Sequence, residues 1–168
     1  VSNSVICYGL GAIKGTGESA IAAIVSAREE NGPFTSLFNF CARVDRGKLN
    51  KRTVEALIKA GAFDSLHLDR ATLLANIDLA FDYALAQEAN AHQVGLFDLA
   101  DDGHGSSTQE PALTEATPWD LRERLQQEKT ALGFHLSGHL FDACADEVRR
   151  FVRTPLANLE ESREPQLL

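Results

Sequence analysis

Apolar residues recur three and four positions apart along most of the chain, which is the spacing of an amphipathic α-helix. In the segment that begins at Glu18, apolar side chains recur from Ala20 to Val25, and Gly32-Pro33 then ends the pattern. The alternation of apolar and polar residues that is typical of strands is scarce in this sequence. The sequence therefore predicts an all-α chain.

Residues that cap helices mark where further helices begin. Ser36 is placed to cap one helix, and Asn50 is placed to cap another, which Gly61 would end. Asp69 precedes a longer apolar stripe that runs to Ala84. This stripe predicts one continuous, long helix.

The chain changes character after the long helix. Residues 91–118 are rich in glycine, serine and proline, and they contain acidic groups but no Lys or Arg. Such a segment buries too little apolar surface to offset its ordering entropy, so we expect a flexible acidic linker. A helix is predicted to resume after Pro118 and to end before Gly133, and a further helix fits 140–152.

The first chemical signal is the turn Gly15-Thr16-Gly17, which precedes the helix that begins at Glu18. Glycine permits positive φ and the close approach of another backbone, and at a Gly17 with positive φ a β-branched residue would be strained. Free N–H groups and the dipole at the start of a helix suit a phosphate, and Lys14 adds a positive charge beside them. This helix-hairpin-helix pattern holds the nucleic-acid backbone without reading sequence, although a plain tight turn is the alternative.

A second, poorer copy of the pattern follows at 54–63, where Gly61 is the only glycine. The whole chain has a net charge of −8, but residues 43–59 carry six basic side chains against two acidic ones. Two hairpins would pack as one unit with two phosphate grips joined by this basic segment, although an ordinary solvated helix face is the alternative reading of the charge. The predicted DNA-binding residues are Lys14, Gly15, Thr16, Gly17, Lys48, Lys51, Arg52, Lys59 and Gly61.

A second signal lies inside the acidic linker. A glutamine and two spacers precede a Leu-Phe pair, in the stretch Gln93, Val94, Gly95, Leu96 and Phe97. The glutamine can bond the rim of a partner's pocket while the two apolar side chains fill it, so the stretch is typical of a linear docking peptide. The alternative is an apolar patch that folds back on its own domain.

The sequence contains no catalytic constellation such as a Walker loop or a Gly-x-Ser-x-Gly motif. His135 and His139 lie four apart, but glycines interrupt the helix that would bring them together, so we expect no metal site. The three cysteines are widely spaced and are interpreted as buried thiols of a cytosolic protein. No apolar run is long enough to span a membrane, and no secretory signal is present. The chain lacks methionine, so we expect it to be a piece of a longer protein.

Several stretches closely resemble the alpha subunits of bacterial replicative DNA polymerase III, the C-family polymerases. The resemblance runs over nearly the whole chain and is most specific in 8–64. It is carried by Tyr8–Gly17, Gly32-Pro33-Phe34, Leu37-Phe38, Phe40-Cys41, Asn50-Lys51-Arg52, Glu55–Asp64, Glu128-Lys129, Leu132-Gly133 and Leu136–His139. Leu140 departs from the family, in which a proline usually follows Gly-His.

The resemblance implies that the hairpin domain holds duplex DNA and that Gln93–Phe97 docks on the sliding clamp, the beta subunit. It implies other subunits of the polymerase III holoenzyme as partners, a cytoplasmic location and no membrane. The catalytic carboxylates of that family are not in these residues, so nucleotidyl transfer and its Mg²⁺ would belong to other parts of the longer protein. We therefore expect no cofactor and no catalytic residue in this chain.

The expected organisation has five parts. They are a tandem helix-hairpin-helix DNA-binding domain at 1–66, a long helix packed on it at 67–90, the flexible acidic linker with the clamp-binding motif at 91–118, a helical segment at 119–153, and the approach to an OB domain at 154–168. A structural spacer between the fingers and OB domains, with no binding activity of its own, is the main alternative. A helix-hairpin-helix repair or recombination protein is a further one.

Overall fold

The computed structural model describes residues 8–67, 69–97 and 109–152, except that the side chains of 91–97 lie outside this description. Within these ranges the chain is all-helical, as its sequence predicts. The elements are the 3-10 helix η1 (Leu10–Ala12), α1 (Glu18–Asn31), α2 (Leu37–Arg43), α3 (Lys51–Lys59), α4 (Arg70–Ala75), α5 (Ile77–Phe97), α6 (Leu121–Leu132), the 3-10 helix η2 (Leu140–Ala143) and α7 (Ala145–Phe151).

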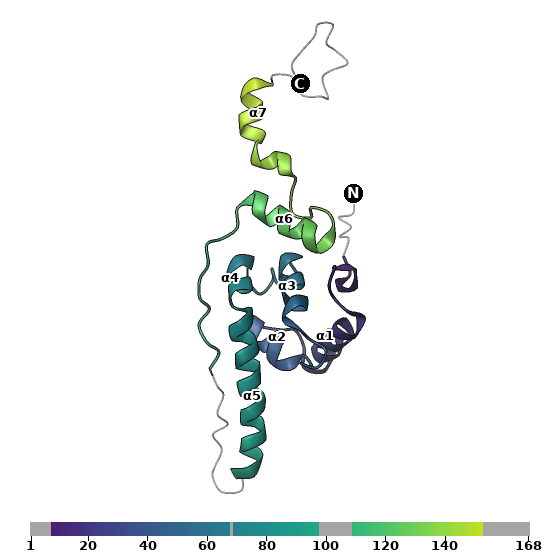
Figure 1. Ribbon diagram of the computed structural model, residues 1–168, viewed down its shortest axis with the longest axis vertical. Coiled ribbons are helices and arrows are strands. Elements are labelled where there is room, and N and C mark those ends of the chain that lie inside the picture. The colour runs from purple at the N-terminus through teal and green to yellow at the C-terminus, as the bar shows by residue number, and fades with distance from the viewer. Residues whose placement is uncertain (1–7, 68, 98–108, 153–168) are drawn as a thin grey trace.

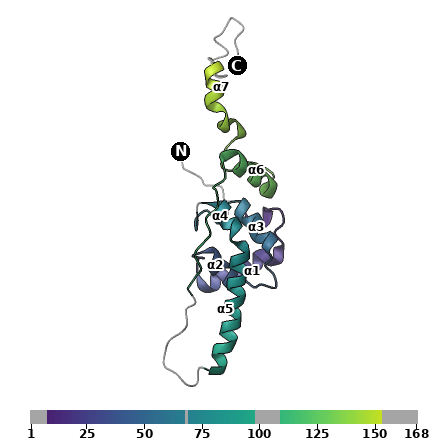
Figure 2. The same cartoon turned by 60° about the vertical axis from the view of Figure 1, so that its left-hand side comes forward.

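Helices α1 to α4 gather around the amino-terminal part of α5, and the carboxyl end of α5 projects away from them (Figure 1). Helix α6 lies at the opposite end of this body, and α7 extends beyond it (Figures 1 and 2). Aromatic contacts join the elements, because the Phe40 ring of α2 meets Phe63 at 4.9 Å and Phe38 meets Tyr83 of α5 at 5.4 Å, between ring centroids. Helix α3 is central, with Val54, Leu57 and Ile58 fully buried.

The caps predicted from the sequence are confirmed. Ser36, Asn50 and Asp69 each accept a backbone N–H of the following turn, at 2.9, 2.8 and 3.0 Å. Gly32 and Gly61 follow α1 and α3 with φ of 75° and 81°, in the left-handed region that ends helices. These capping residues and glycines therefore fix where the helices of the hairpin region begin and end.

The predicted long helix is divided into α4 and α5 at Asn76. The Asn76 side chain is buried and donates to the carbonyls of Thr72 and Thr114, at 2.8 Å each. Its Oδ1 also accepts the Thr114 amide at 2.9 Å. A residue pattern within 69–84 cannot show this interruption, because the partner that holds Asn76 lies in a distant segment. The helix expected at 140–152 is likewise divided, into η2 and α7.

The structure also differs from the expected linker boundaries. Helix α5 continues to Phe97, and residues 98–108 lie outside the described ranges. Residues 109–118 are held against the hairpin body, since Ser36 Oγ donates to Glu110 at 2.8 Å and the Ala116 amide donates to Thr72 at 3.0 Å. The side chain of Leu113 packs against the core. The composition of residues 109–118 predicts a flexible segment, because it does not reveal the hydrogen-bond partners that α2 and α4 supply.

Candidate nucleic-acid interface

The turn between η1 and α1 presents backbone N–H groups to solvent. Gly17 is the N-cap of α1 with extended backbone (φ −81°, ψ 149°), and no side chain caps the helix. The amides of Ala20 and Ile21 donate to the Gly17 carbonyl at 3.1 Å each. Those of Glu18 and Ser19, both exposed residues, make no hydrogen bond within the described part of the chain. Helix α1 therefore offers free donors and the positive end of its dipole to an anion.

Gly15, not Gly17, holds the unusual backbone conformation of this turn. Its φ is 88°, whereas Gly17 has φ −81°. The Thr16 hydroxyl closes the turn from inside, 2.7 Å from the Ile13 carbonyl and 3.1 Å from that of Leu10. A Cβ on Gly17 would meet nothing closer than 3.9 Å. The strain that the sequence suggested for a residue at Gly17 therefore belongs to Gly15.

A groove of about 280 Å³ lies beside the turn, between α3 and α6. Lys14 from the turn and Arg52 and Lys59 from α3 all line this groove, so the fold brings these predicted DNA-binding residues together. Lys59 is only partly exposed and is paired with Glu55, Nζ to Oε1 2.5 Å. Lys14 and Arg52 are exposed and form no ion pair within the described residues.

Lys48 and Lys51 are not brought to the turn in the same way. Lys48 pairs with Asp45, Nζ to Oδ2 3.6 Å. Lys51 faces α5, where its ammonium donates to Asp78. This hydrogen bond raises the pKa of Lys51 above its ordinary value, and the charge of Asp82 adds to the effect. The basic segment is therefore partly neutralised by carboxylates of α5.

The turn of the second hairpin, between α3 and α4, is filled by a side chain of the chain itself. The Gly61 amide donates to the Ile58 carbonyl at 2.9 Å, so it is not free. The guanidinium of Arg70 lies against this glycine, such that a Cβ on Gly61 would fall 2.3 Å from Nη2. Arg70 Nε and Nη2 bond both carboxylate oxygens of Asp64, at 2.7 and 2.6 Å. Unlike Gly15, Gly61 therefore lies in a turn that is closed internally.

Glu128 ties α6 to this second turn, a role that no sequence pattern indicated. It is fully buried and accepts Arg70 Nη1 at 3.0 Å. The amides of Leu136 and Ser137 donate to its other oxygen, at 2.7 and 2.9 Å. Burial alone would raise the pKa of Glu128, but the hydrogen bonds from Ser137, Leu136 and Arg70 outweigh it and lower the pKa below the ordinary value. The sequence does not show that Glu128 is buried, because Arg70, which pairs with it, lies 58 residues away in the chain.

The segment Gln93–Phe97, which the sequence predicts to bind the clamp, falls in the last turns of α5, whose backbone is helical there. The side chains of these residues lie outside the described part of the structure. The end of α5 that carries them projects away from the hairpin body (Figure 1). These residues thus lie at a protruding helix end, not in the flexible linker that the composition predicts.

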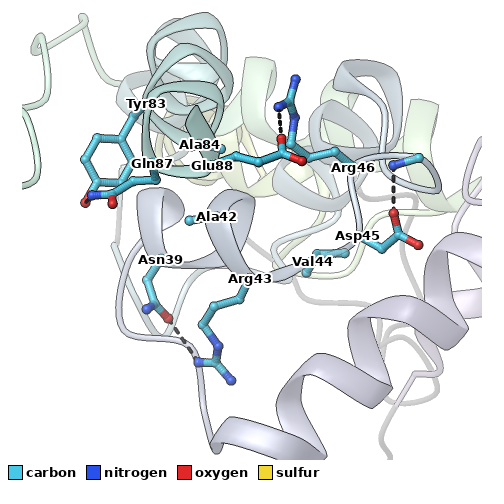
Figure 3. Close-up of a pocket in the computed structure, with 11 residues that line it drawn as sticks. Asn39, Ala42, Arg43, Val44, Asp45, Arg46, Tyr83, Ala84, Gln87 and Glu88 are labelled. Carbon is cyan, nitrogen blue, oxygen red and sulfur yellow. Dashed lines mark hydrogen bonds and ion pairs between the residues drawn. The ribbon is translucent and has the colours of Figure 1, made fainter. Parts of the chain in front are cut away.

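A larger hollow, of about 580 Å³, lies between α2 and α5 (Figure 3). Its charged side chains bond within the chain, since Arg46 pairs with Glu88 at 2.6 Å and Arg43 donates to Asn39 at 3.1 Å. Arg43 also donates to the carbonyl of Ala27 at 2.7 Å. These cations hold elements of the chain together, whereas Lys14 and Arg52 beside the first hairpin turn form no ion pair within the described residues.

No group of three or more His, Cys, Asp or Glu side chains within the described ranges is arranged to hold a metal ion. Among the helices that the structure describes, none has the length and apolar character needed to cross a bilayer.

Comparison with known proteins identifies the region that contains both hairpins. Residues 1–73 match the helix-hairpin-helix motif family. The chain is 50% identical to DNA polymerase III subunit alpha of Neisseria meningitidis over 92% of its own length. It is 42% identical to the corresponding subunit of Pseudomonas aeruginosa over 96% of its length, and 38% identical to that of Caulobacter vibrioides over 89%.

The chain spans only 13 to 15% of the length of these relatives. The matched helix-hairpin-helix residues contain η1, the Gly15–Gly17 turn, α1 and the second hairpin as far as α4. By its sequence, this chain is therefore similar over about nine tenths of its length to one segment of bacterial DNA polymerase III alpha subunits, and its residues 1–73 match a helix-hairpin-helix motif family.

Proposed function

We propose that this chain holds duplex DNA by its sugar-phosphate backbone, without sequence preference, as a non-catalytic part of a replicative polymerase. The observation that carries the proposal is the exposed turn at Gly15–Gly17, which leads to the uncapped start of α1 within the matched helix-hairpin-helix region. Backbone N–H groups at a helix start bind phosphate oxygens and cannot distinguish bases. Lys14 and Arg52 add positive charge beside them.

Duplex binding is tested by fluorescence anisotropy of a labelled duplex titrated with the 168-residue chain, at about 50 and 200 mM salt. We expect equal affinity for duplexes of different sequence and a logarithmic salt slope of about −2 to −3, as two or three neutralised phosphates give. No saturable binding at the lower salt concentration, or a clear preference for one base sequence, would contradict the proposal.

We propose that this segment acts as part of a longer polymerase. The relatives are named as alpha subunits of DNA polymerase III, and we propose that nucleotidyl transfer, and the Mg²⁺ it uses, belong to parts of such a protein outside this segment. Its partners would be the other holoenzyme subunits, and its site of action the cytoplasm. The segment would then contribute grip on the duplex product and not chemistry.

We further propose that Gln93–Phe97 tethers the chain to the sliding clamp and so supports processive synthesis. The projection of the α5 end away from the hairpin body supports this role, because a docking segment must be accessible to its partner (Figure 1). Burial of a Leu and a Phe side chain is worth about 1.5–3 kcal/mol each, which ordering of the peptide opposes at about 1–2 kcal/mol per residue. These opposing contributions are of similar size, so we expect a contact no tighter than micromolar, about −8 kcal/mol at best.

Calorimetry of the 168-residue chain against a bacterial sliding clamp tests the tether. The double variant Leu96→Ala/Phe97→Ala should lose the binding heat. The matched control Leu85→Ala, which removes an exposed leucine of the same helix, should keep it. Equal heats for the parent chain and the double variant would favour the structural spacer.

A further inference from the structure

We propose that the groove between the first hairpin turn, α3 and α6 binds a second DNA phosphate, and that α6 forms one wall of this site. The inference rests on the proposed binding of duplex DNA and adds a position to it. Helix α6 (Leu121–Leu132) lies beyond residues 1–73, the range that matches the helix-hairpin-helix family. The DNA-binding surface would thus extend past the hairpins themselves.

Three elements make the groove, which has a volume of about 280 Å³. One face of α3 supplies residues at helical spacing, and the last turn of α6 supplies small side chains that leave the groove open. The lining consists of Lys14, Gly15, Arg52, Glu55, Ala56, Lys59, Thr130 and Ala131. Gly15 belongs to both the hairpin turn and the groove. A DNA strand whose phosphate binds the α1 amides would therefore pass beside the proposed second phosphate site.

The charges of the groove favour an anion. Three cationic side chains and one carboxylate, that of Glu55, give it a net charge of +2. Glu55 is held by Lys59 at 2.5 Å, which leaves Lys14 and Arg52 as the cations without an ion pair within the described residues. A guanidinium from α3 and an ammonium from the turn, both lining one groove, are well suited to a phosphate, which accepts several charge-assisted hydrogen bonds.

Helix α6 shapes the groove despite the negative end of its dipole. The carboxyl end of a helix normally disfavours an anion. Here the Ala131 carbonyl accepts the Lys14 amide at 2.8 Å, which satisfies it and fixes the backbone of the turn to α6. Gly133 ends α6 with φ 93°, and a Cβ there would lie 3.2 Å from Lys14 Nζ. The last turn of α6 therefore both positions Lys14 and leaves room for its ammonium group.

Two substitutions in the groove test the second phosphate in opposite directions. Thr130→Glu places a carboxylate on the α6 wall and should weaken duplex binding about fivefold at low salt, the effect of one unit charge at contact distance in water. Glu55→Gln removes the one carboxylate of the groove and should strengthen binding by a similar factor. Ala86→Glu, at an exposed position of α5, is the control for Thr130→Glu, and Glu29→Gln, at an exposed position of α1, is the control for Glu55→Gln. Each makes the same change in net charge as its groove variant, away from the groove. These two controls should bind as the parent chain does.

The outcomes separate this inference from the proposed function. If the parent chain binds duplex and both groove variants behave like their controls, the second phosphate position is wrong while duplex binding at the hairpin stands. If the parent chain shows no saturable binding, the proposed function fails and the second position fails with it. Shifts of opposite sign at Thr130 and Glu55, with thermal stability unchanged, support the inference.

Discussion

Arg70 and Glu128 stand 58 residues apart in the sequence and form a buried ion pair, Nη1 to Oε1 3.0 Å. Arg70 begins α4 and closes the second hairpin turn over Gly61, whereas Glu128 belongs to α6. The pair thus fixes α6 against the hairpin body, and α6 in turn bonds the Lys14 amide through Ala131. One buried contact links the second hairpin to the exposed turn of the first.

Glu128→Gln should destabilise the fold strongly. The substitution leaves the Arg70 charge buried beside Asp64 alone, and loss of one partner of a buried ion pair costs about 3–5 kcal/mol. The free energy of unfolding from urea denaturation measures the loss. Asp146→Asn, which breaks the exposed pair with Arg149, is the control and should change stability by less than about 1 kcal/mol. Similar values for the two variants would contradict the importance of the buried pair.

The contribution of Glu128 to stability should depend on pH in a defined direction. Its pKa is lower in the folded chain than in the unfolded one, where a glutamate titrates near 4.5. The stabilisation is therefore fully present above about pH 4.5 and is lost as the pH falls through the lower folded value. The gap in melting temperature between the parent chain and Glu128→Gln should be constant from pH 7 to about pH 5 and shrink below about pH 4. A gap that grows on acidification would reverse the assigned sign.

Gly15→Ala should destabilise the first hairpin, because φ of 88° places a Cβ against the following carbonyl and costs about 1–2 kcal/mol. Gly11→Ala is a matched control, since its Cβ would meet nothing within 4 Å and its φ is not positive. It should change stability by no more than about 1 kcal/mol. Thermal unfolding of both variants checks the difference. Equal melting temperatures would mean that the turn does not require glycine at position 15.

Gly17→Asp should raise stability and weaken DNA binding at once. Aspartate is a better N-cap than glycine by a few tenths of a kcal/mol and also interacts favourably with the helix dipole. Its carboxylate would accept the amides that α1 offers to a phosphate, and it would add negative charge there. Melting temperature and duplex anisotropy are measured on the same sample. A stabilised variant with undiminished DNA affinity would show that the start of α1 is not the phosphate grip.

Arg52→Gln and Lys51→Gln should differ although the two residues are adjacent. Arg52 lines the groove without an ion pair in the described structure, so its loss should weaken duplex binding and reduce the salt slope by about 0.9. Lys51 is engaged by Asp78 of α5, so its loss should change both values little. Salt titrations of the two variants make the comparison. An equal effect of both would favour the whole basic segment as the interface.

Local signals predicted the helical elements well. Ser36 and Asn50 cap the helices that they were expected to cap, and Asp69 caps α4, the first part of the expected long helix, because a cap bonds to amides only two or three residues away. The turn at Gly15–Gly17 is likewise encoded within a few residues, and so is the start of α1. The sequence does not indicate which glycine of the turn has positive φ, since either of the two can adopt that conformation.

Tertiary structure decided the features whose partners lie far apart. Asn76 divides a continuous apolar stripe because Thr114 supplies its partner, and Glu128 is buried because Arg70 reaches it across 58 residues. In the sequence, the cations of the basic segment 43–59 cannot be told apart. In the fold, Lys51 bonds a carboxylate of α5, whereas Arg52 lines the groove with Lys14. Composition and spacing determined the helices and the hairpin turn, since these depend on neighbours in the chain. Which cations remain available to DNA depended on packing, which the order of residues does not reveal.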